Sequence, residues 1–175
     1  MDGTSPASGI GGRVARVLAG RRNRGDLALG SPVSGRVVPL SDVPDKVFSS
    51  GALGDGVGVQ PDEGGAVAPI GGTVQAAMPH AYGISAGDVE VLVHIGVDTV
   101  ELGGRHFTQL VTPGTVVERG AQLADFDIEG IRSAGFDPVV MVIVTRRPPR
   151  GTALVVADAG ARIAAGDDIL EITAK

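Results

Sequence analysis

The sequence predicts an all-β fold, an antiparallel β-sandwich or barrel-like arrangement with few short helices. Short runs of valine, isoleucine and leucine recur along the chain, and glycine or proline interrupts them at regular intervals, which is typical of strands joined by tight turns. The 175 residues include 28 glycines and 11 prolines, a composition that favours turns over long helices. Two internal sequence echoes also indicate that a strand–turn–strand unit is duplicated.

The apolar runs locate the expected elements. Short helices are expected at 128–134 and at 99–102 or 107–111. The expected strands are 27–30, 35–40, 57–60, 66–68, 73–78, 82–85, 89–95, 115–117, 122–127, 139–145, 153–157 and 169–172.

The two echoes have matching spacings. In the first, residues 31–37 and 68–74 share the order small residue, proline, β-branched residue, small residue, glycine, any residue and valine. The second repeats a glycine, five residues, a glycine, two residues and an aliphatic residue, and it relates Gly114, Gly120 and Leu123 to Gly160, Gly166 and Ile169.

The chain divides at about residue 25. The first 25 residues carry five arginines against one acid and have no apolar core of the signal-peptide type. Four apolar residues between 10 and 18 have helical spacing, but neighbouring glycines weaken such a helix by about 1 kcal/mol each. We therefore expect a flexible basic tail over 1–25, with at most a weak contact to a membrane surface or a partner. A single domain should follow over 26–175.

Composition excludes several functions. The chain has no cysteine, which removes disulfides, a thiolate nucleophile and cysteine-based zinc sites. It has no tryptophan and one tyrosine, and its net charge is −5, so a nucleic-acid partner is not expected. No apolar run approaches the roughly 20 residues that span a membrane. We expect a cytoplasmic protein, or one peripheral to the inner face of the membrane.

The segment 91–102 contains the strongest candidate site. His94 lies near the end of an apolar strand, where an imidazole is costly unless it is hydrogen-bonded or used. Gly96 follows, and Asp98 and Thr99 then add a carboxylate and a hydroxyl. A lone histidine of this kind is more often a satisfied core group than a functional one.

A second histidine changes that interpretation. The strands 82–85 and 89–95 flank a turn, so His80 and His94 should lie at the same end of neighbouring antiparallel strands. His106, the third histidine, follows two glycines and an arginine and is expected in an exposed turn.

Taken in order, these motifs resemble enzyme IIA of the glucose family of the phosphoenolpyruvate-dependent sugar phosphotransferase system, over about residues 27–175. The matching segments are 31–35, 42–48, 54–56, 67–74, 80–81, 107, 114–120, 138–140 and, in every position close to the family signature, His94-Ile95-Gly96-Val97-Asp98-Thr99-Val100-Glu101-Leu102.

The resemblance implies a β-sandwich and a phosphotransferase that acts through a phosphohistidine intermediate. His94 would accept a phosphoryl group from the histidine-containing phosphocarrier protein and pass it to the IIB domain of a sugar permease. His80 would be the supporting histidine. Asp45 and Asp98 would flank the site and meet arginines of the carrier, and the carbonyl of Gly96 would hold the active imidazole in one tautomer.

The chemistry of these residues is consistent with that role. A neutral imidazole, with an ordinary pKa near 6.5, is a competent nucleophile at cellular pH. An apolar rim formed by Val47, Phe48, Leu53 and Leu92 would exclude water during transfer between proteins. No cofactor is required, although a zinc ion held by the two histidines and a partner's carboxylate is conceivable. Regulatory partners are also conceivable.

Some positions depart from the family pattern. Met78 replaces a threonine whose hydroxyl bonds the supporting histidine in relatives. Lys46 and Ala76 replace larger apolar residues of the rim, and Arg105 and His106 replace a glutamate and a glycine.

Three alternatives remain at this point. A zinc peptidase of the lysostaphin type shares half of its metal motif with His94 and Asp98, but it needs a further His-x-His that this chain lacks. A biotin or lipoate carrier needs a hairpin lysine, whereas the only lysines are Lys46 and Lys175. A non-catalytic regulatory binding module on the same fold would keep the apolar face without needing His94.

Overall fold

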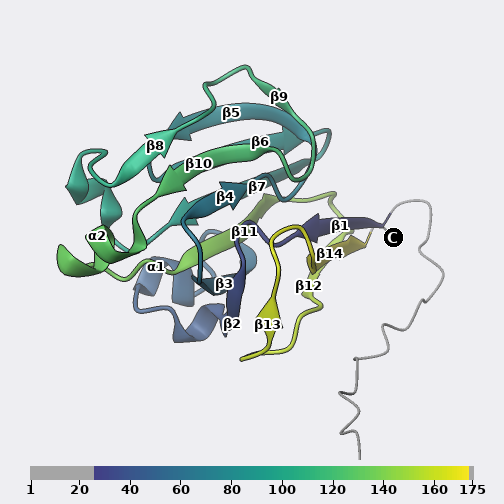
Figure 1. The fold of residues 1–175 in the computed structure, drawn as a ribbon. Coiled ribbons are helices and arrows are strands. Elements are labelled where there is room, and N and C mark those ends of the chain that lie inside the picture. The colour runs from purple at the N-terminus through teal and green to yellow at the C-terminus, as the bar shows by residue number, and fades with distance from the viewer. Residues whose placement is uncertain (1–25, 174–175) are drawn as a thin grey trace, which may run out of the picture.

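The structure is a computed structural model that describes residues 26–173, and antiparallel strands dominate it (Figure 1). The described residues contain two short α-helices, α1 (Lys46–Ser49) and α2 (Ile128–Ser133), and two 3₁₀ helices, η1 (Leu40–Asp42) and η2 (Thr99–Leu102). The strands are β1 (Leu27–Gly30), β2 (Gly35–Pro39), β3 (Asp55–Pro61), β4 (Gly65–Val67), β5 (Gly72–Met78), β6 (Ala81–Ala86), β7 (Val89–Ile95), β8 (Phe107–Gln109), β9 (Val116–Val117), β10 (Gln122–Phe126), β11 (Val140–Arg146), β12 (Thr152–Val155), β13 (Arg162–Ile163) and β14 (Asp168–Thr173).

The strands form three antiparallel sheets. The largest has eight strands in the order β13-β2-β3-β11-β7-β6-β5-β9, and two three-stranded sheets have the orders β1-β14-β12 and β4-β10-β8. The prediction of an antiparallel all-β fold is therefore confirmed. The large sheet is open, with β13 and β9 at its edges, so the sheets of the described residues do not close into a barrel.

Differences from the expected elements are local. The segment 107–111, one of two places offered for a short helix, begins with the strand β8, while η2 occupies the other. The helices α1 and η1 and the two-residue strand β13 were not predicted, because they are too short to show a hydrophobic period. No helix among the described residues is long and apolar enough to span a membrane.

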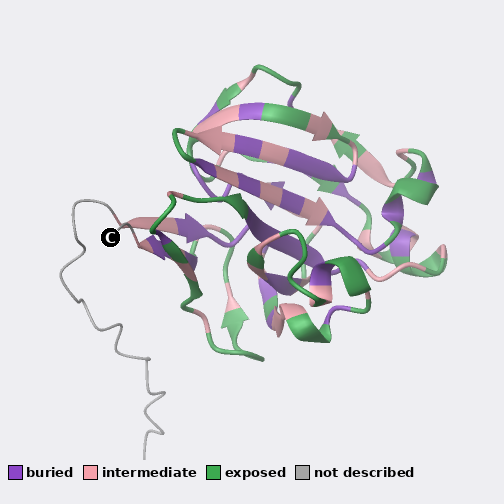
Figure 2. Cartoon of the chain, turned by 180° about the vertical axis from the view of Figure 1, so that it is seen from behind, coloured by how far each residue is buried: buried purple, intermediate pink, exposed green. Residues whose placement is uncertain are grey.

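The large sheet has apolar side chains on both faces at its centre. Along β7, Val89, Val91, Val93 and Ile95 are buried in the main core, while the alternate positions are half-buried on the opposite face. Figure 2 shows the molecule from behind, with buried and half-buried positions alternating along the strands. Every residue of 140–144 in β11 is buried, so both faces of that strand are covered. The outer cover is a smaller cluster formed by Val43, Phe48, Val97, Val139, Met141 and Ile143.

Hydrogen bonds reveal the duplication that the sequence echoes indicate. The amide of Gly30 donates to the carbonyl of Pro69, and the amide of Val67 donates to the carbonyl of Pro32, each at 2.8 Å. Residues 30 and 32 of the first echo correspond to residues 67 and 69 of the second, at a constant offset of 37. In each echo the earlier residue donates and the later one accepts, so the two turns contact one another reciprocally. The second echo behaves similarly: Gly120 donates to Ala68, Gly166 to Ser31, Gly114 to Val74 and Gly160 to Val37, all at 2.8 Å.

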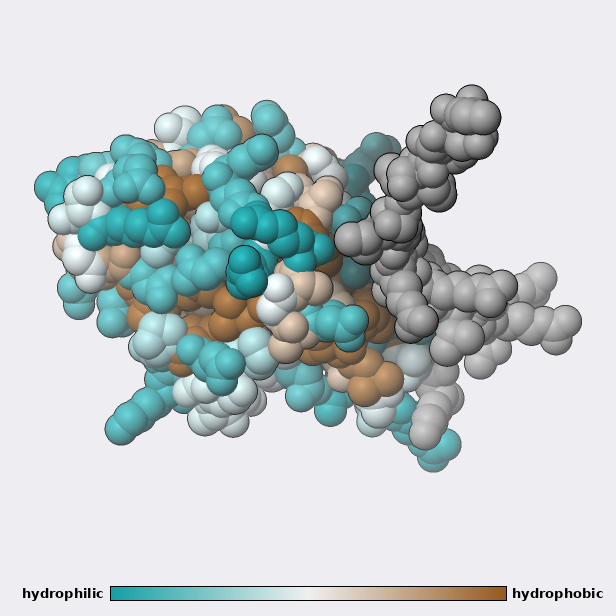
Figure 3. All heavy atoms as spheres, turned by 60° about the horizontal axis from the view of Figure 1, so that its bottom comes forward, coloured by the Kyte–Doolittle hydropathy of each residue, from teal (hydrophilic) through white to brown (hydrophobic). Residues whose placement is uncertain are grey.

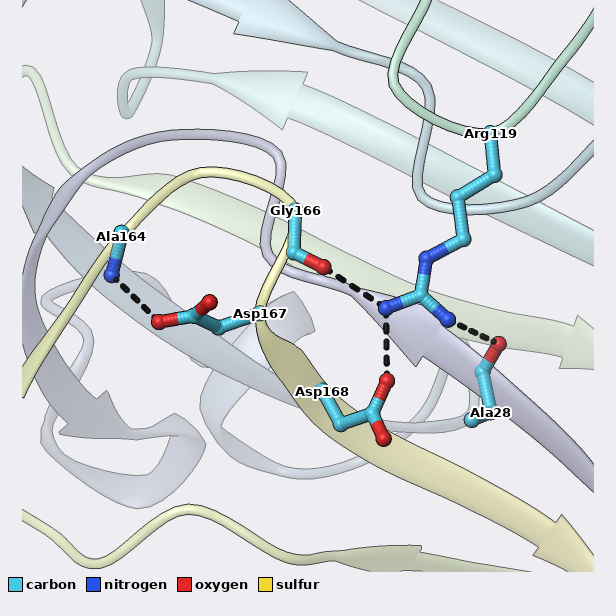
Figure 4. A network of polar contacts seen from close by, with 6 residues as sticks. All are labelled: Ala28, Arg119, Ala164, Gly166, Asp167 and Asp168. Atoms are coloured by element: carbon cyan, nitrogen blue, oxygen red, sulfur yellow. Dashed lines mark hydrogen bonds and ion pairs between the residues drawn. The ribbon is translucent and has the colours of Figure 1, made fainter.

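One arginine ties the two repeats together (Figure 4). Arg119, in the turn between β9 and β10, donates to the carbonyls of Ala28 at 3.2 Å and Gly166 at 2.7 Å. Its guanidinium also pairs with the carboxylate of Asp168 at 2.6 Å. Arg119 therefore links a turn of one repeat to the first and last strands of the domain.

Candidate functional site

The register of two hairpins brings the two predicted histidines together. His94 lies on β7 opposite Ala81 of β6, and His80 is the residue before Ala81 in the β5–β6 turn. The amide of Ile95 donates to the carbonyl of His80 at 2.7 Å, which fixes the turn against the end of β7. The two imidazole rings stand nearly perpendicular, with their centroids 5.2 Å apart. His94 is half-buried, and His80 is 7% exposed.

The backbone after β7 turns sharply and presents a carbonyl to His94. Gly96 has a φ of +81°, a left-handed conformation that glycine adopts without strain. Its carbonyl lies 2.8 Å from His94 Nδ1. Because a carbonyl can only accept, the neutral imidazole places its proton on Nδ1 and leaves the lone pair of Nε2 free.

This turn leaves no room for a larger residue. A Cβ added at Gly96 would collide with Thr99 Cγ2 and would lie 3.1 Å from the carbonyl oxygen of Asp137. Thr99 is fully buried, and its hydroxyl donates to the carbonyl of Ile95 at 2.5 Å. Thr99 thus holds the turn and does not face the histidine rings with a free hydroxyl. Asp98 is exposed and has a φ of +58°.

The short helix α1 brings a carboxylate and an aromatic ring to the same place. Asp45 caps this helix, and its Oδ1 accepts from the amides of Val47 at 2.8 Å and Phe48 at 3.3 Å. Asx capping of this kind fixes a helix too short to be stable alone. Phe48 is 6% exposed, and its ring centroid lies 4.9 Å from that of His94.

Burial is the main influence on the charge of His94. Desolvation by burial and, to a smaller extent, the neighbouring His80 lower the pKa of His94, while the Gly96 hydrogen bond and the carboxylates of Asp45 and Asp98 oppose the shift; the net result is a pKa of about 4. Burial also lowers the pKa of His80. Both rings are therefore neutral at pH 7, and His94 combines a neutral ring with a fixed tautomer.

Exposed apolar side chains come from the segments that flank the histidines. Val47 and Leu53, from α1 and the loop after it, are 52% and 38% exposed. Met78, in the strand before His80, and Val100, in η2, are 48% and 61% exposed. Leu92 is half-buried on the same face of β7 as His94. Figure 3 shows the molecule with the lower side of Figure 1 brought forward, where brown apolar side chains emerge between teal polar ones.

Sequence reasoning did not identify the buried apolar cluster that lies next to these exposed side chains. Met141 of β11 lies opposite His94 in the strand register and is fully buried, together with Val43, Val97, Val139 and Ile143. A signal was available, because the run 139–145 is apolar at consecutive positions and so requires a cover on both faces of its strand. The sequence alone does not say which segment supplies that cover.

His106 lies in a turn, as expected, and is partly exposed. Its side chain is 26% exposed, and its Nδ1 lies 3.8 Å from Asp127 Oδ2, beside the start of α2. It is not part of the histidine pair. The described residues contain no group of three or more histidine, cysteine, aspartate or glutamate side chains placed to hold a metal ion, so the zinc suggestion gains no support.

Known proteins match this chain over most of its length. Residues 27–148 match the family described as "phosphoenolpyruvate-dependent sugar phosphotransferase system, EIIA 1". The β-glucoside-specific EIIBCA component of Halalkalibacterium halodurans is 43% identical over 148 residues, which cover 83% of this chain and 23% of that protein. The corresponding component of Bacillus subtilis is 44% identical over 118 residues, 66% of this chain and 19% of that protein. The chain thus spans about a fifth of the length of these relatives.

The fold also matches a solved structure. Glucose permease IIA from Mycoplasma capricolum superposes with a TM-score of 0.75 and 29% sequence identity, covering 83% of this chain and 95% of that one. These matches do not favour the peptidase, the prosthetic-group carrier or the regulatory module. The chain belongs to the EIIA family of the phosphoenolpyruvate-dependent sugar phosphotransferase system, whose members carry phosphoryl groups in sugar uptake.

Proposed function

We propose that Nε2 of His94 carries the phosphoryl group, accepting it from the histidine-containing phosphocarrier protein and passing it to the IIB domain of a sugar permease. The observation that supports this most is the 2.8 Å contact between His94 Nδ1 and the carbonyl of Gly96. It keeps one nitrogen protonated and leaves the lone pair of the other free. Positioning of this kind dominates catalysis of phosphoryl transfer.

The transfer conserves protons and electrons. The lone pair of His94 Nε2 forms a bond to phosphorus, while the nitrogen–phosphorus bond of the carrier's phosphohistidine breaks and its electron pair returns to the carrier's imidazole. Nδ1 of His94 keeps its proton and its hydrogen bond to Gly96 throughout. In the onward step a nucleophile of the IIB domain forms the new bond to phosphorus, and the electron pair returns to Nε2. We propose that these steps need no cofactor.

His80 assists without carrying phosphate. Its ring lies beside that of His94, with centroids 5.2 Å apart, so a ring nitrogen can donate to the oxygens of the phosphoryl group. Asp45 and Asp98 lie close enough to act electrostatically on His94. In our proposal these carboxylates attract basic side chains of the partner, which in turn offset the charge of the phosphoryl group.

The relatives suggest the acceptor. Matches to β-glucoside-specific EIIBCA components support a IIB domain of that type as the partner. We accordingly propose that the reaction takes place on the cytoplasmic side, at the inner face of the membrane. We also propose that regulatory proteins are further partners of the face that carries the two histidines.

A labelling experiment tests these roles. The protein is incubated with phosphoenolpyruvate labelled with ³²P, enzyme I and the carrier, and acid-labile phosphate is then measured. His94→Gln should take up no label. His80→Gln should accept phosphate from the carrier, but onward transfer to a IIB domain from a β-glucoside-specific relative should slow by about 10²-fold or more, since it loses a donor to the transferred group.

The third histidine supplies the matched control. His106→Gln makes the same substitution beside Asp127, away from the histidine pair, and should behave as the unaltered protein in both steps. Undiminished labelling of His94→Gln would refute the assignment of the phosphorylated residue. An onward rate equal to the unaltered protein in His80→Gln would refute only the supporting role.

A further inference from the structure

A peptide unit next to His94 is hydrogen-bonded at both of its ends. The carbonyl of Gly96 lies 2.8 Å from His94 Nδ1. The amide of Val97, at the other end of the same peptide unit, donates to the carbonyl of Asp137 at 3.0 Å. Because a trans peptide unit is planar, its carbonyl and its amide point in nearly opposite directions. The bond to Asp137 therefore determines where the carbonyl of Gly96 points.

The segment that accepts this bond is itself held in one shape. Oδ1 of Asp137 accepts from the amide of Val139 at 2.9 Å, which closes a turn within the segment 137–139. Pro138, between them, restricts its own φ and has no amide to donate. The carbonyl of Val139 accepts from the amide of Gly96 at 2.8 Å. The segment 137–139 thus binds the turn after β7 at two consecutive amides.

A residue of another strand completes the arrangement. Gln60, near the end of β3, donates from Nε2 to Asp137 Oδ1 at 2.9 Å. In the large sheet β11 lies between β3 and β7, so the segment 137–139, which leads into β11, lies between Gln60 and the turn after β7. A carboxylate oxygen can accept two donors, and this one does so from its own segment and from β3. The position of Asp137 is therefore set from both sides.

The packing of the fold does not account for this pair. Gln60 and Asp137 are half-buried and belong neither to the main core nor to the smaller cluster of the outer face. Both line an open hollow of about 460 Å³. A hydrogen bond in such a place adds little to the free energy of folding, because water can replace either partner. Its specific effect is on the orientation of the segment that holds the histidine turn.

We propose that Asp137, held by Gln60, is a positioning residue for the transfer of phosphoryl groups by His94. It acts by fixing the peptide unit after Gly96, whose carbonyl keeps the imidazole proton on Nδ1. The inference rests on the proposed function and deepens it. If this peptide unit rotates, Nδ1 loses its acceptor, and Nε2 carries the proton in part of the molecules. In those molecules Nε2 has no lone pair with which to form a bond to phosphorus.

The tautomer of His94 can be measured directly. Ring ¹⁵N chemical shifts at pH 7.5 should show a protonated Nδ1 and an unprotonated Nε2 in the unaltered protein. Asp137→Ala and Gln60→Leu should bring the two shifts closer together, because both tautomers are then populated. The change should be larger in Asp137→Ala, which loses both hydrogen bonds. Asp137→Asn keeps an oxygen that can accept both, so it should retain the single tautomer.

Kinetics provide a second measurement. The kcat for phosphate uptake from the carrier should fall by about 10-fold or more in Asp137→Ala, since small errors of position in a reacting group are costly. The KM for the carrier should stay unchanged, because Asp137 acts on the orientation of the imidazole and not on contact with the carrier. Asp137→Asn should restore the rate.

A second aspartate supplies the matched control. Oδ2 of Asp167 accepts from the amide of Ala164 at 3.1 Å in the turn between β13 and β14 (Figure 4). Asp167→Ala therefore loses a side-chain hydrogen bond of the same kind at a turn away from the histidine pair. It should change neither the ¹⁵N shifts of His94 nor the kcat.

The outcomes separate this proposal from the proposed function. An unchanged tautomer or an unchanged kcat in folded Asp137→Ala would overturn the positioning role, as would an equal defect in Asp137→Asn. If Asp137→Ala does not fold, Gln60→Leu decides the question, because it keeps the carboxylate and its turn; an unaltered tautomer there would overturn the proposal. The ¹⁵N measurement needs no phosphoryl donor. Absence of label on His94 in the unaltered protein, with the tautomer shifted in Asp137→Ala, would count against the proposed function alone.

Discussion

At the scale of single residues, burial holds the imidazole of His94 in its neutral form down to an acidic pH that would protonate a free imidazole. Its ring centroid lies 4.9 Å from that of Phe48 and 5.2 Å from that of His80, and burial is the largest cause that lowers its pKa from 6.5 to about 4. The hydrogen bond to Gly96 and two nearby carboxylates oppose the shift without cancelling it. The protein therefore keeps the ring neutral through burial and keeps its tautomer through one carbonyl.

This arrangement predicts a pH-dependent stability. Between pH 6.5 and pH 4 the unfolded chain binds a proton at residue 94 that the folded chain does not bind, so acidification favours unfolding. The contribution is fully present above pH 6.5 and is lost as the pH falls toward 4. Urea unfolding should show a loss at pH 4.5, relative to pH 7.5, of roughly 2 to 3 kcal/mol from this residue.

The variant His94→Gln isolates that contribution. Its free energy of unfolding should fall less between pH 7.5 and pH 4.5 than that of the unaltered protein, because glutamine does not titrate. The other titrating groups are common to both proteins, so the difference reports on His94 alone. His80 is expected to add a change of the same sign in both proteins, since burial lowers its pKa too. Identical pH dependence in the two proteins would show that His94 is not shielded from water as the structure indicates.

The sequence predicted the pairing of the histidines but only part of their surroundings. His80 and His94 could be placed together because a short turn between two alternating strands leaves one register for the hairpin. Phe48 was named as a rim residue, yet its ring is buried against His94, and this contact depends on a helix of four residues. Met141 was missed, because a long-range strand pairing has no local signature.

At the scale of elements, the molecule contains two similar strand–turn–strand units that hydrogen-bond to one another through their turns. The reciprocal bonds between Gly30 and Pro69 and between Val67 and Pro32 follow from the duplicated sequence. The arginine contact shown in Figure 4 does not: the position equivalent to Arg119 in the other repeat is Ala165. One side of the repeat pair thus has a polar contact that the other lacks.

Removal of that contact should weaken the association of the repeats. Arg119→Ala deletes two hydrogen bonds to carbonyls and the ion pair with Asp168. The side chain of Arg119 is 34% exposed and that of Asp168 is 40% exposed. Because solvent screens such a pair, we expect a loss of about 1 to 2 kcal/mol in the free energy of unfolding. Thermal and urea denaturation would measure it.

A surface arginine with a single partner gives the comparison. Arg132→Ala removes only the ion pair with Glu129 within α2 and should change the free energy of unfolding by less than about 0.5 kcal/mol. If both variants lose the same amount, Arg119 does not link the repeats as its contacts suggest.

The fold class and the duplication were predictable, whereas the sheet order was not. Periodicity marks where a strand lies and which face is apolar, so β7 and the segment of β11 could be read from the sequence. The neighbour of β11 on each side, β3 and β7, is separated from it by tens of residues, and periodicity does not encode such partners. The open edges at β9 and β13 follow from that order.

At the scale of the whole molecule, the first and last described strands pair with each other. β1 begins at Leu27 and pairs with β14, which ends at Thr173, in the register Leu27 opposite Ile172 (Figure 1). Arg119 contacts the carbonyl of Ala28 beside this pair. The family match likewise begins at residue 27. The expected tail over 1–25 lies outside the described residues, and the boundary near residue 25 stays a prediction.

Deletion of residues 1–25 tests that boundary and the role of the tail. The melting temperature and the uptake of phosphate from the carrier should be unchanged, because strand β1, the hydrogen bond from Arg119 to Ala28 and the histidine site all lie beyond the deletion. Binding to vesicles rich in anionic lipid should fall at low salt, since each of the five arginines can contribute about 1 kcal/mol near such a surface, less the screening by salt. Loss of phosphate uptake would mean that the domain begins earlier than β1. Equal vesicle binding with and without residues 1–25 would show that the tail does not contribute to contact with the membrane surface.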